Sequence, residues 1–554
     1  MRSSPTSAGA KVLVIGLDGA TPELLTRWVA EGKLPNIASV AERGHLGPLR
    51  STPNFLSSSA WPSFVTGLQP GNHGVFYFRD RVPGTYQTTY QNASQRDGIA
   101  MWSALSEAGR RIGSLFVPMT WPVVPVNGVL ASGWLAPSIH DPHFCHPKEY
   151  VERILKVCPD FHLHTGMTEY VRKGNYAEPL AQKKRLLRYK ADVAVDLLRN
   201  DAWDLFITVF HETDPTQHFF WHFQDPNHPQ YNMPGAEAFR SAVFDMYREA
   251  DDAVGRLLEV VGDDSYVFIM SDHGAGPNTR CYLYLKNLLR AHGLEVPRRP
   301  SLSGRIARWM RVLALHTVPE PVRHRILFRF KGLREKLATK AFEADVDWAK
   351  TRAYAFWCGT ASEPWLNVRG RDPEGIVEPG EEYDRVAAQV ADAVLETLDP
   401  ATGEPLVQAV RRKDEMYWGP HLNRAPDLFI AWRPDVVVNG LQMGPQGQVI
   451  DRPVVEDPRT GDHRPDGILA AAGPRGSFGT APTDANIADL APTIYGLLDM
   501  APPHPMDGRA WTELFPQAVR VHPPARDKVT TLAGEHTSHE DEVIEKRLED
   551  LGYL

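Results

Sequence analysis

Cysteine is scarce in this chain: only four are present among 554 residues, at positions 145, 158, 281 and 358. Their spacing contains no CxxC pair, so the sequence predicts neither a thiolate zinc site nor a disulfide framework. Long apolar runs are also missing. The first run, residues 12–17, is too short for the core of a signal peptide or for a membrane span. We therefore expect a cytoplasmic protein with no transmembrane segment.

A large excess of charge of one sign is absent as well. The chain has 60 lysines and arginines against 68 aspartates and glutamates, a formal net charge of -8. A nucleic acid duplex is therefore not expected as a partner. Hydrophobic residues make up 42% of the chain, which is typical of a globular protein and excludes a disordered or fibrous one. The composition gives no signal for an oligomeric state.

Basic residues are concentrated in one part of the chain. Residues 297–340 contain twelve lysines and arginines but only two acids, Glu320 and Glu335. Apolar residues at helical spacing accompany them, so we predict a basic helical insertion at 277–344, which either caps the active site or forms a solvated surface. The predicted organisation is a disordered tail at 1–10, a core at 11–276 and 345–515, this insertion, and a C-terminal arm with a helix at 516–554.

Short aliphatic and aromatic runs indicate an α/β fold. Five of them read as buried parallel strands, at residues 12–17, 112–117, 205–210, 266–270 and 468–472. Helical patterns lie between them, and one has a clear start in which Thr21 supplies a capping hydroxyl and Pro22 the first helical residue. The sequence thus predicts a mostly parallel central sheet with helices on both faces. In such sheets ligands bind at the carboxyl ends of the strands.

Residues of metal-ligating type stand next to four of these runs. They are Asp18, Asp214, His218, Asp272, His273 and His463. Asp214 and His218 are four residues apart and fit the first turn of one helix. Asp272 and His273 are adjacent, and we expect Gly274 and Gly276 to let the chain turn so that both reach one site.

Each of these six residues could instead have a purely structural role. An isolated aspartate after a strand is often a helix cap, and an isolated histidine is often part of the core or the surface. Their common position at one edge of the predicted sheet favours a metal site. Three aspartates and three histidines without cysteine favour zinc over manganese or iron.

Serines that could act as a nucleophile occur in the segment 57–76. They are Ser57, Ser58, Ser59 and Ser63, and composition alone does not choose among them. The segment continues with Thr66-Gly67 and then with Pro70, His73 and Gly74 in a P-x-x-H-G pattern.

This pattern resembles the nucleophile turn of the alkaline phosphatase superfamily, in its type I phosphodiesterase/nucleotide pyrophosphatase branch. The resemblance extends over nearly the whole chain, through the segments VLVIGLDGATPELL, TDPTQHFFW, SDHG and DHRPDGILAAAGP. Further segments are similar to bacterial members described as phosphohydrolases or phosphomutases, such as ADLAPTIYGLLDM and the terminal LGYL.

The resemblance implies a function for each of these residues. The family nucleophile stands nine positions before the threonine of the T-G pair, which is Ser57 in this chain. Two zinc ions are implied: one held by Asp214, His218 and His463, and the other by Asp18, Asp272, His273 and the Ser57 oxygen. The implied reaction proceeds through a phosphoserine intermediate.

The chain also departs from the family pattern. Many nucleotide pyrophosphatases carry an asparagine shortly after the H-G pair, whereas this sequence has Tyr77, Phe78 and Arg79. Arg79 either stabilises charge on the phosphate or is a surface arginine. Sulfatase chemistry is disfavoured, because the residues after Ser57 lack the proline and arginine of the sulfatase frame.

The sequence thus predicts a metal-dependent hydrolase of a small phosphorylated substrate, with phosphodiesters or pyrophosphates favoured over monoesters. A phosphomonoesterase or a phosphomutase with the same site is the nearest alternative. A binding protein that has kept the fold and lost catalysis is a more distant one, since no expected ligand or nucleophile is missing.

Overall fold

The computed structural model describes residues 9–163, 165–298, 345–357, 362–450 and 457–529, together with 541, 544, 545, 547 and 548. The predicted basic insertion therefore lies outside the described residues from position 299 to 344, and the predicted tail lies outside them up to position 8. Within the described ranges, no helix combines the length and apolarity needed to span a membrane.

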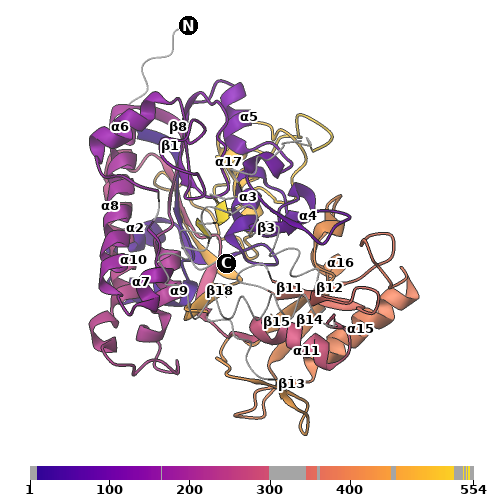
Figure 1. Ribbon diagram of the computed structural model, residues 1–554. Coiled ribbons are helices and arrows are strands. Elements are labelled where there is room, and N and C mark those ends of the chain that lie inside the picture. Colours follow the sequence, from indigo (N-terminus) through magenta and orange to yellow (C-terminus); the bar gives the residue numbers. More distant parts are fainter. Residues whose placement is uncertain are drawn as a thin grey trace.

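A central sheet of eight strands forms the framework (Figure 1). Its strands, in spatial order, are β2 (His45–Arg50), β19 (Asp466–Ala472), β9 (Tyr266–Met270), β1 (Gly9–Leu17), β8 (Ala202–Phe210), β5 (Ile112–Val117), β6 (Gly128–Ser132) and β7 (Cys145–His146). The five consecutive strands from β9 to β6 are parallel, which confirms the predicted mostly parallel sheet.

For one of the five predicted strands, the predicted parallel direction was wrong. The run at 468–472 forms most of β19, which is antiparallel to both of its neighbours, β9 and β2. Its apolar composition is the same as that of the parallel strands, because β19 is also buried on both faces. Composition reports this burial but carries no information about strand direction.

Helices cover both faces of the sheet, as the alternation along β1 shows. Leu13, Ile15 and Leu17 belong to one hydrophobic cluster, while Val12 and Val14 belong to another. The first cluster is formed with α1 (Pro22–Ala30), α2 (Pro35–Arg43), α6 (Glu149–Val157), α7 (Thr168–Arg172), α8 (Ala177–Asn200), α9 (Thr213–Gln224) and α10 (Ala242–Val261). The second is formed with α3 (Ser57–Thr66), α5 (Met101–Glu107) and α17 (Leu490–Leu497). In Figure 1, α8 and α10 lie on the opposite side of the sheet from α3 and α17.

The start of α1 differs from the prediction in one detail. Pro22 is its first residue, as expected, but the Thr21 hydroxyl does not cap the helix. It donates a hydrogen bond of 2.9 Å to the Ala275 carbonyl and accepts one of 2.8 Å from the Ala275 amide. This threonine therefore links the loop after β1 to the strand that follows β9.

A third hydrophobic cluster lies beside the sheet and is built from residues 281–450. Its elements are α11 (Leu285–Ala291), β11 (Ala353–Trp357), β12 (Ser362–Leu366), α15 (Glu381–Leu395), β14 (Val407–Arg412) and β15 (Leu428–Trp432), with α16 (Lys413–Met416), β13 (Thr397–Leu398), β16 (Leu441–Met443) and β17 (Val449–Ile450) around them. In Figure 1 this unit lies to the lower right of the sheet. Small elements between the units are α4 (Pro70–His73), β3 (Arg79–Arg81), β4 (Thr88–Tyr90), β10 (Gly274–Pro277) and β18 (Gly461–Arg464).

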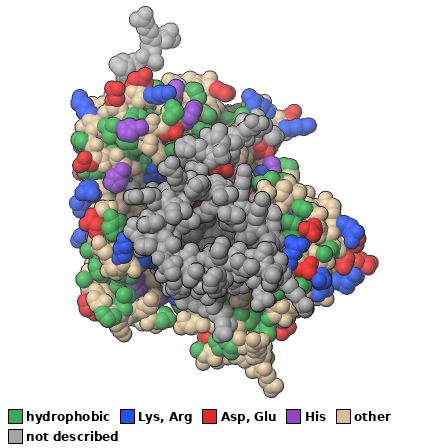
Figure 2. Space-filling view, viewed as in Figure 1, with side chains coloured by type: hydrophobic (Ala, Val, Ile, Leu, Met, Phe, Trp, Pro, Cys, Tyr) green, Lys and Arg blue, Asp and Glu red, His purple; other side chains and the backbone are tan. Residues whose placement is uncertain are grey.

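The surface in Figure 2 carries charged side chains of both signs. In its coloured part, lysines and arginines are interspersed with aspartates and glutamates, including the area over α15. Near the other end of the chain, Ile544 and Leu548 are buried in the first hydrophobic cluster, and Arg547 donates to the Pro137 carbonyl at 2.9 Å.

Candidate active site

Three neighbouring parallel strands place the candidate site. Asp18 directly follows β1, Asp272 and His273 follow β9, and Asp214 lies four residues after the end of β8. Because these three strands are adjacent and parallel, their carboxyl ends meet at one edge of the sheet. The structure thus brings the predicted residues of these segments together.

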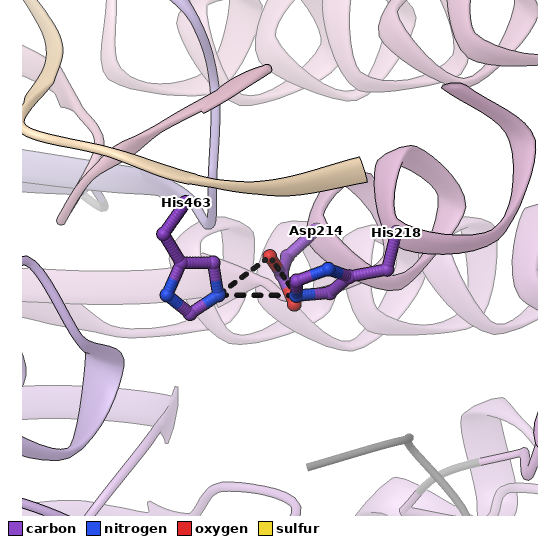
Figure 3. Close-up of side chains that lie close together, drawn as sticks. All are labelled: Asp214, His218 and His463. Atoms are coloured by element: carbon purple, nitrogen blue, oxygen red, sulfur yellow. Dashed lines mark hydrogen bonds and ion pairs between the residues drawn. The ribbon is translucent and has the colours of Figure 1, made fainter. Parts of the chain in front are cut away.

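Asp214, His218 and His463 form one cluster, in which all three side chains point toward one another (Figure 3). The Nε2 atoms of His218 and His463 are 3.0 Å apart. They lie 3.2 Å and 3.6 Å, respectively, from Oδ1 of Asp214. All three side chains are buried.

Helix α9 sets the spacing of two of these residues. It begins at Thr213, so Asp214 and His218 lie one turn apart on the same face, as predicted. The Nδ1 atom of His218 lies 2.8 Å from the Gly461 carbonyl, which can only accept a hydrogen bond. Nδ1 therefore carries a proton, and Nε2 faces His463 and Asp214.

Asp18, Asp272 and His273 form the second cluster. The Nε2 atom of His273 lies 3.6 Å from Oδ1 of Asp18 and 3.4 Å from Oδ2 of Asp272. The Ser57 oxygen joins them, at 3.0 Å from Nε2 of His273 and 3.4 Å from Oδ1 of Asp18. The Nδ1 atom of His273 donates to the Gly274 carbonyl at 2.8 Å, which leaves Nε2 directed at the cluster.

Strands β10 and β18 hold the two clusters next to each other. Ala275 pairs with His463, and the rings of His273 and His463 are stacked with their centres 3.7 Å apart. Gly274 does not form the turn that the sequence suggested, because it is already part of β10. A Cβ atom on Gly274 would lie 2.2 Å from the Asp466 carbonyl oxygen, so glycine is required there by the close approach of two backbones.

Asp18 is held by residues that the sequence reasoning did not select. The Nδ1 atom of His211 lies 3.0 Å from Oδ2 of Asp18, and the Thr213 hydroxyl donates to the Asp18 carbonyl. Asp18, His211 and Asp214 together form a third group with metal-ligand geometry. His211 directly follows β8, so the rule that selected Asp18, a polar residue at the end of a buried strand, would also have found His211.

Gly19 allows the loop after β1 to enter the site. Its φ of +70° is in the left-handed region, and a Cβ atom there would lie 3.0 Å from Oδ1 of Asp214. The Gly19 amide donates to Oδ1 of Asp272 at 3.2 Å, and its carbonyl accepts a hydrogen bond of 2.7 Å from the Gln217 side chain. These contacts connect the ends of β1, β8 and β9.

Of the four candidate serines, only Ser57 contacts these clusters. The Ser58 hydroxyl donates to the Phe76 carbonyl, and that of Ser59 donates to Oδ1 of Asn54. The Ser63 hydroxyl lies 3.0 Å from Nε2 of His73, which is buried and belongs to neither cluster.

Ser57 also occupies the first position of α3. The backbone hydrogen bonds of this helix begin with the amides of Ser59 and Ala60, which both donate to the Leu56 carbonyl. The amides of Ser57 and Ser58 precede that ladder, and the amino-terminal end of a helix favours a negative charge.

Burial and mutual repulsion perturb the ionisation of the clustered groups. Burial raises the pKa of Asp18, and the carboxylates of Asp272 and Asp214 raise it further. Burial would also raise the pKa of Asp214, but the imidazoles of His218, His463 and His273 outweigh it and hold this pKa well below the usual range.

The donor set fits divalent cations. Oxygen and nitrogen atoms of three carboxylates and three imidazoles converge in two adjoining groups, without cysteine. The Nε2 atoms of two imidazoles face each other at 3.0 Å, with Oδ1 of Asp214 beside both. The buried Oδ2 of Asp272 accepts no hydrogen bond from any described residue. A bound cation would satisfy these atoms.

Arg79 is not part of these clusters. It is the first residue of β3, and its guanidinium lies over the ring of Tyr90, 5.5 Å from the ring centre. Among the described residues, no hydrogen bond or ion pair joins Arg79 to Ser57 or to the six clustered side chains. Its Nε atom is buried without a hydrogen-bond partner in this part of the chain.

A cavity of about 600 Å³ adjoins the clusters. His463 and Leu56, the neighbour of Ser57, line it on the side of the sheet. Glu363 of β12 and Phe429 of β15 line it on the side of the third hydrophobic cluster. The cavity therefore lies between the central sheet and the third hydrophobic cluster, next to the segment that contains Ser57.

One family model covers most of the chain. Residues 12–456 match the family model for type I phosphodiesterase/nucleotide pyrophosphatase. Seven of the eight predicted site positions fall within this range, and His463 follows it. A search of curated protein sequences finds no match.

Solved structures with a similar fold include two kinds of protein. Phosphonoacetate hydrolase from Sinorhizobium meliloti 1021, in complex with phosphonoformate, is 13% identical, with 88% of this chain and 95% of that chain covered and a TM-score of 0.48. Human ectonucleotide pyrophosphatase/phosphodiesterase 5 is 12% identical, with 90% and 97% covered and a TM-score of 0.46. An inactive form of the murine protein in complex with AMP is 13% identical, with the same coverage and a TM-score of 0.47.

Proposed function

The chain belongs to the type I phosphodiesterase/nucleotide pyrophosphatase family and is thus a phosphoester hydrolase, and from this premise we propose that it cleaves phosphodiester or pyrophosphate bonds with Ser57 as the nucleophile. The observation that carries the proposal is the contact of the Ser57 oxygen with Asp18 and His273. No other candidate serine has such a contact.

We propose that two zinc ions complete the site. Asp214, His218 and His463 hold one, and Asp18, Asp272, His273 and Ser57 hold the other, with manganese or iron as alternative metals. Such ions supply positive charge that lowers the pKa of a coordinated hydroxyl and stabilises negative charge on the phosphate and on the leaving oxygen.

The side chain of Ser57 then carries out the displacement at phosphorus. The Oγ atom of Ser57 loses its proton and attacks phosphorus, and the bond from phosphorus to the leaving oxygen breaks. The product is a phosphorylated Ser57, which in the case of a diester still carries the second alcohol. Attack by water breaks the bond between phosphorus and Oγ, and Oγ regains a proton.

Other residues position the reacting groups. The amides of Ser57 and Ser58, at the start of α3, face negative charge on the phosphoryl group. His211 and Thr213 fix Asp18 in place. We retain Arg79 as a proposed phosphate-binding residue on the basis of its charge alone, and the cytoplasm as the proposed location on the basis of the scattered cysteines.

A panel of chromogenic substrates tests this proposal. We expect kcat/KM to be higher for bis(p-nitrophenyl) phosphate and for a nucleotide p-nitrophenyl ester than for p-nitrophenyl phosphate, in the presence of zinc. A preference for the monoester would instead favour a phosphomonoesterase. Transfer of the phosphoryl group to an added alcohol without release of phosphate would favour a phosphomutase.

A further inference from the structure

A smaller pocket, of about 200 Å³, lies between the end of β3 and strand β12. Its lining residues, all within the described ranges, include three arginines and no acid. The arginines are Arg81, Arg371 and Arg424, and Trp365 and Asn423 lie beside them. We call this the arginine pocket. None of its lining residues belongs to the clusters of the candidate active site.

Two of the three arginines are held in place by buried carboxylates. Arg81 forms an ion pair with Asp372, and Arg371 donates to both oxygens of Asp427, at 2.6 Å and 2.8 Å. The guanidinium carbons of Arg81 and Arg371 lie 5.2 Å and 5.6 Å from the centre of the Trp365 ring. These contacts give two cations and one indole ring fixed positions on the wall of the pocket.

Arg424 is the least compensated of the three arginines. Its Nη2 atom donates to the side-chain oxygen of Gln91 at 3.2 Å. The same atom lies 3.8 Å from Oδ2 of Asp80, which is too far for a hydrogen bond. The Nε atom of Arg424 is buried and has no acceptor among the described residues. A guanidinium group binds oxyanions through such N–H donors.

The indole N–H of Trp365 is a second donor without an acceptor. Trp365 is only 3% exposed, and its Nε1 atom has no hydrogen-bond partner in the described part of the chain. A buried indole N–H usually has an acceptor, because an unpaired buried donor is unfavourable. The two unpaired donors, on Trp365 and Arg424, therefore belong to residues that line the same pocket.

The ion pairs around the arginine pocket leave one positive charge in excess. Three carboxylates take part in them, against four cations: Asp80, Asp372 and Asp427 against Arg81, Arg371, Lys413 and Arg424. An anion in the pocket would balance this charge and accept hydrogen bonds from the unpaired donors.

The volume of the pocket limits the size of this anion. About 200 Å³ corresponds to roughly six or seven water molecules. This is enough for one small oxyanion and a few waters, but not for a nucleotide. We propose that the arginine pocket binds inorganic phosphate, with Arg424 and Trp365 donating to its oxygens.

Equilibrium dialysis of the purified chain against ³²P-labelled phosphate tests this proposal. The wild type should bind phosphate at the pocket, and Arg424→Gln should raise the Kd of that site at least about tenfold, because a hydrogen bond from a charged donor is lost. Phosphate held elsewhere contributes equally to both chains. The buffer contains chloride, so a site that prefers chloride would show no such difference. Identical binding curves would overturn the proposal.

Matched variants assign the binding to the pocket. Trp365→Phe keeps an aromatic ring but removes the N–H, and it should also raise the Kd about tenfold. The control is Arg369→Gln, since Arg369 is exposed, pairs with Glu378 at 2.8 Å and does not line the pocket. Its Kd should equal that of the wild type. An unchanged Kd in Trp365→Phe, or a rise in Arg369→Gln as large as in Arg424→Gln, would overturn the assignment.

The metal content of the same variants separates this pocket from the candidate active site. Arg424→Gln and Trp365→Phe should retain as much metal as the wild type, because neither residue contacts the clusters of metal-ligating type. Loss of metal together with loss of phosphate binding would place the phosphate at those clusters and overturn the proposal.

Discussion

The Nδ1 atom of His211 lies 3.0 Å from Oδ2 of Asp18, and both side chains are buried. Because the other Asp18 oxygen, Oδ1, faces Ser57 and His273, the contact with His211 fixes the direction in which Oδ1 points. The ring of His211 is itself held by stacking on Trp134, with centres 4.9 Å apart. A residue outside the predicted ligand set thus orients one within it.

Replacing His211 should weaken the site without removing a predicted ligand. We expect His211→Ala to lower metal affinity or kcat about 10- to 100-fold, which is typical when a group that orients a metal ligand is lost. His211→Asn keeps a hydrogen-bond donor and should recover part of the loss. Metal titration and kcat measured separately from KM check this, and an unchanged His211→Ala variant would show that Asp18 needs no such support.

Ser57→Ala should abolish turnover while the fold and the metal content are retained. The nucleophilic oxygen is lost, whereas the six aspartate and histidine side chains remain. The matched control is Ser63→Ala, since the Ser63 hydroxyl contacts His73 rather than the clusters and its loss should change kcat little. Activity near the wild-type level in Ser57→Ala would refute the assignment of the nucleophile.

Metal content gives a prediction that does not depend on the substrate. Elemental analysis of the purified chain should find about two transition-metal ions per chain, and a chelator should remove both metal and activity. Asp272→Ala and His463→Ala should each lose metal, while His45→Ala, on β2 and in none of the clusters, should not. Full activity in a metal-free chain would contradict the two-ion site.

Glu363 gives the unfolding free energy a pH dependence with a definite sign. Its pKa is raised from 4.5 to about 8 in the folded chain. Between these values the folded chain keeps a proton that the unfolded chain has lost, so the contribution of Glu363 to stability falls as the pH rises through this window. Glutamine does not titrate. Glu363→Gln should therefore gain stability relative to the wild type between about pH 5 and pH 8.

Urea unfolding of both chains at several pH values measures this difference. The control is Glu415→Gln, which removes an exposed carboxylate from the rim of the cavity that Glu363 also lines. A difference between Glu363→Gln and the wild type that stays constant across the window would contradict the prediction.

The sheet and the meeting of most candidate site residues at one of its edges could be predicted, because both depend on local patterns. Buried apolar runs indicate strands, and polar residues directly after these runs indicate the edge of the sheet where a site can form. Asp18 and Asp272 follow this rule. Strand direction could not be predicted for β19, because burial on both faces produces the same composition in parallel and antiparallel strands. The turn predicted at Gly274 was wrong, because the glycine is required there by the close approach of Asp466, which lies 192 residues away in the sequence.

The remaining features depend on contacts between distant segments. The cavity combines residues of 50–56, 77, 279–282, 363 and 408–465, and no local pattern indicates that these meet. Glu363 stands in an ordinary strand sequence, and only its surroundings distinguish it from other glutamates.

The stereochemical course at phosphorus tests the central claim, that Ser57 is phosphorylated during the reaction, most directly. A single diastereomer of a phosphorothioate diester is hydrolysed in ¹⁸O-labelled water, and the configuration of the product is determined. Two successive in-line displacements, first by Ser57 and then by water, predict net retention of configuration. Net inversion would show that water attacks the substrate directly and would contradict the account.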